Sequence, residues 1–138
     1  MTRSGAVGVR SLADGVGIAG SALCALHCLV APVLLVAGTT LPATFAAESF
    51  HHALLWSILP ASIVAFGLGC RQHKDWGVLG LGAVGLAGLL VPMLAHGAIG
   101  DFGERAITVA SAGCLIAAHI RNFKRCRVVQ CDHAPSAG

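Results

Sequence analysis

Long stretches without charged residues alternate with short polar segments along the chain. The apolar stretches cover about residues 15–37, 50–70, 77–99 and 106–120. A helix that crosses a bilayer needs about 20 apolar residues; the first three stretches reach that length, and the fourth is short. Open sheets cannot span lipid, because their edge groups would lack hydrogen-bond partners. The pattern therefore predicts an all-α membrane protein with four transmembrane helices.

The polar segments between the stretches are short, so consecutive helices are expected to be antiparallel neighbours in one bundle. This divides the chain into three parts. We expect a cytoplasmic N-terminal segment over residues 1–14, a transmembrane domain over 15–121, and a cysteine-containing basic tail over 122–138.

Basic residues set the expected orientation of the bundle. Of the nine lysines and arginines, all but Arg105 fall at the two ends of the chain or in the second connecting loop. These eight are Arg3, Arg10, Arg71, Lys74, Arg121, Lys124, Arg125 and Arg127. Cytoplasmic loops carry the excess of basic residues, so both termini are predicted to lie in the cytoplasm.

Small residues predict which helix faces pack together, because they let membrane helices approach closely. The fourth stretch carries a stripe made of Ala106, Ala110, Gly113 and Ala117. The third stretch carries Gly80, Gly82, Gly85 and Gly88. Both sets are expected to face neighbouring helices.

Composition agrees with lipid as the main solvent. Hydrophobic residues make up 56% of the 138 residues and charged residues only 11%, against about 25% charged in soluble domains. The six cysteines do not indicate a disulfide-stapled secreted domain, since several lie inside apolar stretches. The net charge of +3 comes from short clusters beside the stretches, which indicates membrane topology and no nucleic-acid partner.

The first stretch contains the candidate chemistry. Cys24 and Cys28 are one helical turn apart, and His27 is three residues after Cys24, so the three side chains share one helix face. Two thiols at this spacing can close on a soft metal ion such as Hg(II), Cu(I) or Zn(II). His27 would be a third ligand, or a base that helps to form the thiolate.

A second pair of thiols, Cys126 and Cys131, lies in the basic tail. Arg125 and Arg127 flank Cys126, and cationic neighbours favour the thiolate form of cysteine. The reducing cytoplasm disfavours a stable disulfide there. A flexible charged segment with two thiols is suited to receive a metal ion, so we predict exchange of the ion from the first pair to the tail pair.

Four further residues are weaker candidates for metal binding. Cys114 lies near mid-depth in the fourth stretch, and His119 lies near its cytoplasmic end. His51 and His52 lie on the opposite side of the membrane, where they could attract a cation at the outer mouth of the bundle.

In these features the chain resembles the MerC family of bacterial mercuric-resistance membrane proteins. The resemblance rests on the segment from Leu23 to Leu29 with Pro32 after it, and on the tail pair of cysteines. Glu48 with His51 or His52, the segment 71–74 and the segment 119–122 resemble features of chromosomal relatives. The likeness extends from about residue 15 to residue 133.

The resemblance implies a multi-pass protein of the bacterial inner membrane that carries mercuric ion from periplasm to cytoplasm. Cys24 and Cys28 would bind the ion within the membrane, and Cys126 and Cys131 would pass it to a cytoplasmic metal-thiolate reductase. The metal would be cargo, and no resident cofactor is expected. Three residues separate the first pair here, where the mercuric-operon members have two, so the resemblance favours a soft metal more strongly than mercury itself.

Other functions remain open on the sequence alone. A membrane thiol–disulfide oxidoreductase would also use cysteine pairs, but such enzymes place a Cys-x-x-Cys pair near the membrane surface, and this chain has no such spacing. A transporter or sensor of zinc or copper would use the same ligands, and a structural membrane subunit would use none of them. Nothing resembles a phosphate-binding loop. We expect a transport or binding protein rather than an enzyme.

Overall fold

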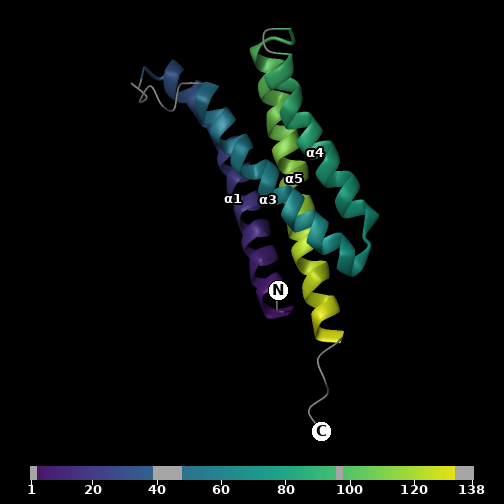
Figure 1. The fold of residues 1–138 in the computed structure, drawn as a ribbon. Helices are drawn as coiled ribbons and strands as arrows, with labels where there is room; N and C mark the ends of the chain where they lie inside the picture. The colour runs from purple at the N-terminus through teal and green to yellow at the C-terminus, as the bar shows by residue number, and fades with distance from the viewer. Residues whose placement is uncertain (1–2, 39–47, 96–97, 133–138) are drawn as a thin grey trace.

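The computed structural model describes residues 3–38, 48–95 and 98–132 and contains four long helices (Figure 1). They are α1 (Arg3–Val36), α3 (Glu48–His73), α4 (Trp76–Leu94) and α5 (Asp101–Asp132). No strand occurs in these ranges. All four helices are long and apolar enough to cross a membrane, which confirms the predicted all-α, four-span fold.

Both α3 and α5 pack against all three other helices, and the most extensive contacts in the bundle are those of α5 with α4 and α1. In Figure 1, α4 and α5 run side by side, while α3 crosses obliquely from the far end of α1 to the start of α4. Consecutive helices run in opposite directions, so the start of α1 and the end of α5 lie at the same end of the molecule. This arrangement agrees with termini on one side, and the cytoplasmic identity of that side stays a prediction.

The first and last helices extend well beyond the predicted apolar stretches. Helix α1 begins at Arg3, so most of the expected N-terminal segment is helical. Helix α5 continues to Asp132, so the expected flexible tail is helical over most of its length. The regions of these two helices that are apolar enough to span a membrane are Val7–Val36 and Asp101–Arg127.

Glycines on α4 allow it to lie close against its neighbours. Gly82 faces the ring of Phe66 on α3, and Gly85 faces Leu115 on α5. A Cβ atom added at Gly85 would lie 2.7 Å from Leu115 Cγ, too close for an unaltered fit. Of the predicted α4 glycines, Gly80 instead faces open space.

The prediction for the small-residue stripe of α5 is wrong. Its four members, Ala106, Ala110, Gly113 and Ala117, are all exposed on the bundle surface. The buried face of α5 carries more polar side chains, among them Thr108, Ser111, His119 and Asn122. Lipid accepts small apolar residues readily, whereas polar side chains need partners inside the bundle. The polar residues therefore mark the packed face.

Asp75 caps the start of α4 and connects it to α5. Its carboxylate accepts hydrogen bonds from the backbone N–H groups of Gly77 and Val78, and it pairs with Arg121 at 3.1 Å and Arg125 at 3.3 Å. Burial acts to raise the pKa of Asp75, but the hydrogen bonds from Arg121 and the helix N-terminus outweigh it and hold the pKa below its ordinary value. The charged carboxylate thus fastens the turn between α3 and α4 to the end of the bundle.

Candidate metal centre

Two helices bring the candidate ligands together. Cys24 and Cys28 lie one turn apart on the buried face of α1, and both side chains are buried. The chain then reverses direction, so the first turns of α3 lie beside the last turns of α1. This hairpin places His51 opposite the two cysteines.

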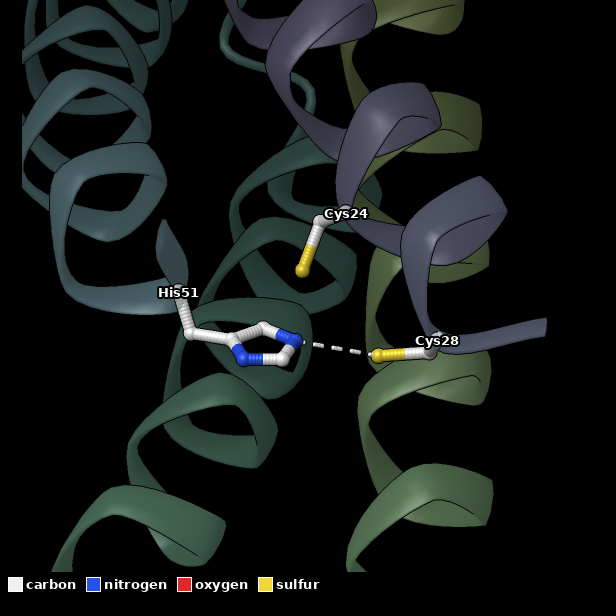
Figure 2. Close-up of side chains that lie close together, drawn as sticks. All are labelled: Cys24, Cys28 and His51. Atoms are coloured by element: carbon white, nitrogen blue, oxygen red, sulfur yellow. Dashed lines mark hydrogen bonds between the residues drawn. The ribbon is translucent and has the colours of Figure 1, made fainter. Parts of the chain in front are cut away.

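The three side chains form one compact group. The two sulfur atoms and a ring nitrogen of His51 all lie within 4.8 Å of one another. Figure 2 shows the thiols pointing toward the imidazole ring, with Cys28 Sγ 3.2 Å from His51 Nε2. At that distance, either the thiol donates a hydrogen bond to neutral imidazole, or the protonated ring donates one to the thiolate. The three donor atoms can therefore converge on one ion.

His27 lies beside this group. Its ring centroid is 4.9 Å from that of His51, in an edge-to-face arrangement, and 4.6 Å from that of Phe50. Within the described residues, the group of converging donor atoms contains His51 and does not contain His27. In this conformation His27 contacts the edge of the His51 ring, while its predicted role as a metal ligand stays untested.

The remaining sequence candidates lie elsewhere. His52 is exposed, and Cys114 is half-buried on α5. Cys126, expected on a flexible tail, is instead buried in the last turns of α5, with 1% of its surface exposed. The side chain of Cys131 is outside the described residues. Within the described residues, Cys126 is not part of the group formed by Cys24, Cys28 and His51.

His119 occupies a different kind of site. Its Nδ1 atom lies 2.9 Å from Asp14 Oδ1, and its Nε2 atom lies 3.1 Å from Ser62 Oγ. Both ring nitrogens thus have protein partners in place of a metal ion. The sequence placed Asp14 in the cytoplasmic N-terminal segment, whereas the structure buries it completely. Its position as a single acid directly before an apolar stretch was the available sign of a buried role.

Two thiols and one imidazole are a donor set for a soft metal. Thiolates select ions such as Hg(II) and Cu(I) over hard cations, and imidazole binds ions of intermediate softness. Structural zinc is almost always held by four ligands, and the described group supplies three. Three protein ligands with an open position also occur in catalytic zinc sites, so the donor set fits a soft metal ion without selecting one.

A protein-family model described as MerC mercury resistance protein matches residues 14–124. The matched region includes all three residues of the candidate metal centre, as well as the four membrane-spanning helices over most of their length. Comparisons with curated proteins and with solved structures find no match.

Proposed function

The chain belongs to the MerC mercury resistance protein family, and from this premise we propose that it takes up mercuric ion across the bacterial inner membrane. The observation that carries the proposal is the convergence of two thiols and an imidazole from α1 and α3 inside a membrane-spanning bundle. Ionisable side chains within membrane-spanning segments are rare and usually functional.

The binding step is an exchange of protons for metal. Hg(II) forms two bonds to sulfur, and the thiols of Cys24 and Cys28 release two protons. His51 lies within hydrogen-bond distance of Cys28; its ring nitrogen either accepts one of these protons or, while neutral, donates its lone pair to the ion. The protons that His51 does not take leave to solvent with the ligands that the incoming ion releases. The ion then leaves when an incoming thiolate attacks it before the outgoing thiolate departs, so no bare ion enters lipid. This stepwise exchange parallels thiol–disulfide exchange in its need for accessible thiolates.

We further propose that the ion passes from Cys24 and Cys28 to Cys126 and Cys131. Cys126 lies near Arg10 and Asp14, toward the end of the bundle where the termini lie. Fourteen residues of helix separate Arg10 from Cys24, which corresponds to about 21 Å at a rise of about 1.5 Å per residue. Direct exchange over that distance is impossible, so transfer requires either helix movement or a carrier thiol. A cytoplasmic reductase would then consume the ion.

The test compares wild type with Cys24→Ser/Cys28→Ser in bacterial cells, using labelled mercuric ion alongside Zn(II) and Cu(I). Cys114→Ser is the matched control, because Cys114 is a free thiol outside the metal centre. We expect the double variant to lose mercury uptake and the control to keep it. Equal uptake by wild type and double variant would refute the proposal. A pair of cysteines that cycles between disulfide and dithiol in vivo would support the oxidoreductase alternative.

A further inference from the structure

A cluster of basic side chains lies where the turn between α3 and α4 meets α5. Asp75 in this turn pairs with Arg121 at 3.1 Å and with Arg125 at 3.3 Å. The side chain of Asp75 is 13% exposed, whereas those of Arg121 and Arg125 are 49% and 59% exposed. The carboxylate therefore lies beneath the two guanidinium groups and fixes their position, while part of each guanidinium group stays open to the surroundings.

The guanidinium of Arg121 has a defined orientation. Its Nε and Nη2 atoms donate to the two carboxylate oxygens of Asp75. The group also packs against the first turn of α4, where a Cβ atom added at Gly77 would lie 3.2 Å from Arg121 Nη2. A guanidinium carries five N–H donors in a planar fork, so the donors that do not bond to Asp75 are held in place for a second acceptor.

Lys74, which directly precedes Asp75, adds a third positive charge to this turn. It is exposed and has a φ of 47°, in the left-handed region that lysine rarely adopts. Glycine adopts that region without a steric cost, so the backbone of the turn does not require lysine, and what lysine supplies is its charge. Three cations then surround one carboxylate, and the cluster keeps a net positive charge.

The lengths of α4 and α5 place this cluster at the membrane surface. Helix α4 has 19 residues, which is about 28 Å at about 1.5 Å per residue and matches a hydrocarbon core of about 30 Å. Its first residue, Trp76, is 77% exposed, and tryptophan is enriched at the level of the lipid headgroups. On α5, Arg121 is 20 residues after Asp101, about 30 Å by the same rise. The cluster therefore lies at headgroup depth, at the end of the bundle where the termini lie (Figure 1).

The face of α5 beneath the cluster offers a smooth surface to a lipid chain. Ala117, Gly113 and Ala110 precede Arg121 at helical spacing, and all three are exposed. Eleven residues of helix separate Ala110 from Arg121, about 16 Å and close to half the thickness of the hydrocarbon core. Small side chains do not obstruct an acyl chain that lies along the helix. This face therefore favours a lipid over a free phosphate ion as the source of an anion bound by the cluster.

We propose that Lys74, Arg121 and Arg125 bind the phosphate group of an anionic phospholipid in the leaflet at the terminal end of the bundle. Arginine is suited to this ligand because its planar fork can donate two parallel hydrogen bonds to phosphate. Basic sites between transmembrane helices bind anionic headgroups in the same way. Asp75 does not prevent binding, because its charge is neutralised by the two ion pairs. The bound lipid links the turn between α3 and α4 to α5, and the site shares no residue with the metal centre.

The test titrates the full chain in detergent with phosphatidylglycerol and counts bound lipid by native mass spectrometry, at about 0.15 M salt so that distant charges are screened. We expect wild type to bind one phosphatidylglycerol in preference to zwitterionic phosphatidylcholine. Lys74→Gln should weaken binding about fivefold and Arg121→Gln/Arg125→Gln about 30-fold, as expected for one and two basic side chains at a membrane surface. Arg127→Gln is the matched control, because this guanidinium lies over the Phe123 ring, 5.5 Å from its centroid. It should bind lipid with an affinity close to that of wild type.

Lys74→Gly separates the charge from the fold. Glycine removes the charge but suits a φ of 47°, so the lipid-free variant should unfold at no lower a temperature than wild type while it loses the same lipid affinity as Lys74→Gln. Equal affinity of wild type for phosphatidylglycerol and phosphatidylcholine would overturn the proposal. An equal loss in Arg127→Gln and Lys74→Gln would also overturn it, because general surface charge would then explain the binding. Displacement of the lipid by an equal concentration of inorganic phosphate would overturn the assignment of a lipid ligand.

Discussion

Replacement of His51 by alanine tests whether the imidazole belongs to the metal centre. His51 Nε2 is 3.2 Å from Cys28 Sγ, and its ring packs against His27. His51→Ala removes the imidazole beside Cys28, whether it acts as a metal donor or as a proton acceptor, but it leaves both sulfur atoms in place. We therefore expect weakened binding of Hg(II) rather than its loss.

The size of the effect follows from the way His51 contacts the site. Loss of a group that hydrogen-bonds to a metal ligand typically lowers metal affinity about 10- to 100-fold, which is about 1.4 to 2.8 kcal/mol. The neighbouring His52 is exposed and outside the group of converging atoms. His52→Ala is therefore the matched control, with the same side chain removed one position away, and we expect it to bind with wild-type affinity.

The assay is a competition titration of Hg(II) between the purified protein in detergent and a small thiol of known affinity. Thermal unfolding of the metal-free proteins shows whether either substitution alters the fold. Wild-type affinity in His51→Ala would refute the assignment of His51 to the site. An equal loss of Hg(II) affinity in His51→Ala and His52→Ala would also refute it, because removal of any histidine at this end of the bundle would then weaken binding.

Two further predictions concern the bundle itself. Gly85→Ala should destabilise the protein, because overpacking against Leu115 costs about 1–3 kcal/mol and better helix propensity offsets only part of that cost. Gly80→Ala places its methyl group in open space and should not lower the melting temperature. Equal melting temperatures for the two variants would contradict the α4–α5 packing. Because the pKa of Asp75 is lowered in the fold, its stabilising contribution is present above its unfolded-state pKa of about 3.9 and is lost as the pH falls through the lower folded-state pKa. Melting temperatures measured from neutral to acid pH should therefore fall more in wild type than in Asp75→Asn, and parallel curves would rule out the ion pair with Arg121.

The number of helices and the position of the thiol pair could be predicted from the sequence. Apolar length alone determines that a segment can span a bilayer, and a spacing of four residues places Cys24 and Cys28 on one face of any helix. The helix ends could not be predicted in the same way. Helices α1 and α5 continue past the apolar stretches, because a helix does not need lipid in order to continue.

Contacts between helices were the part that the sequence left open. His51 is 23 residues from Cys28 along the chain, and the sequence placed it only at the outer mouth of the bundle, apart from the thiol pair. Rotation of α3 about its axis decides whether His51 or His52 faces the thiols, and that rotation depends on packing along the whole helix. The pairing of Asp14 with His119 joins residues that are 105 positions apart, beyond any local pattern.

The central claim is that Cys24 and Cys28 hold a soft metal ion inside the bundle, and X-ray absorption of the purified protein loaded with Hg(II) tests it most directly. The account predicts one strongly bound ion per chain with two sulfur neighbours in wild type, and loss of that ion in Cys24→Ser/Cys28→Ser. Retention of the same bound ion and the same sulfur neighbours in the double variant would contradict the account.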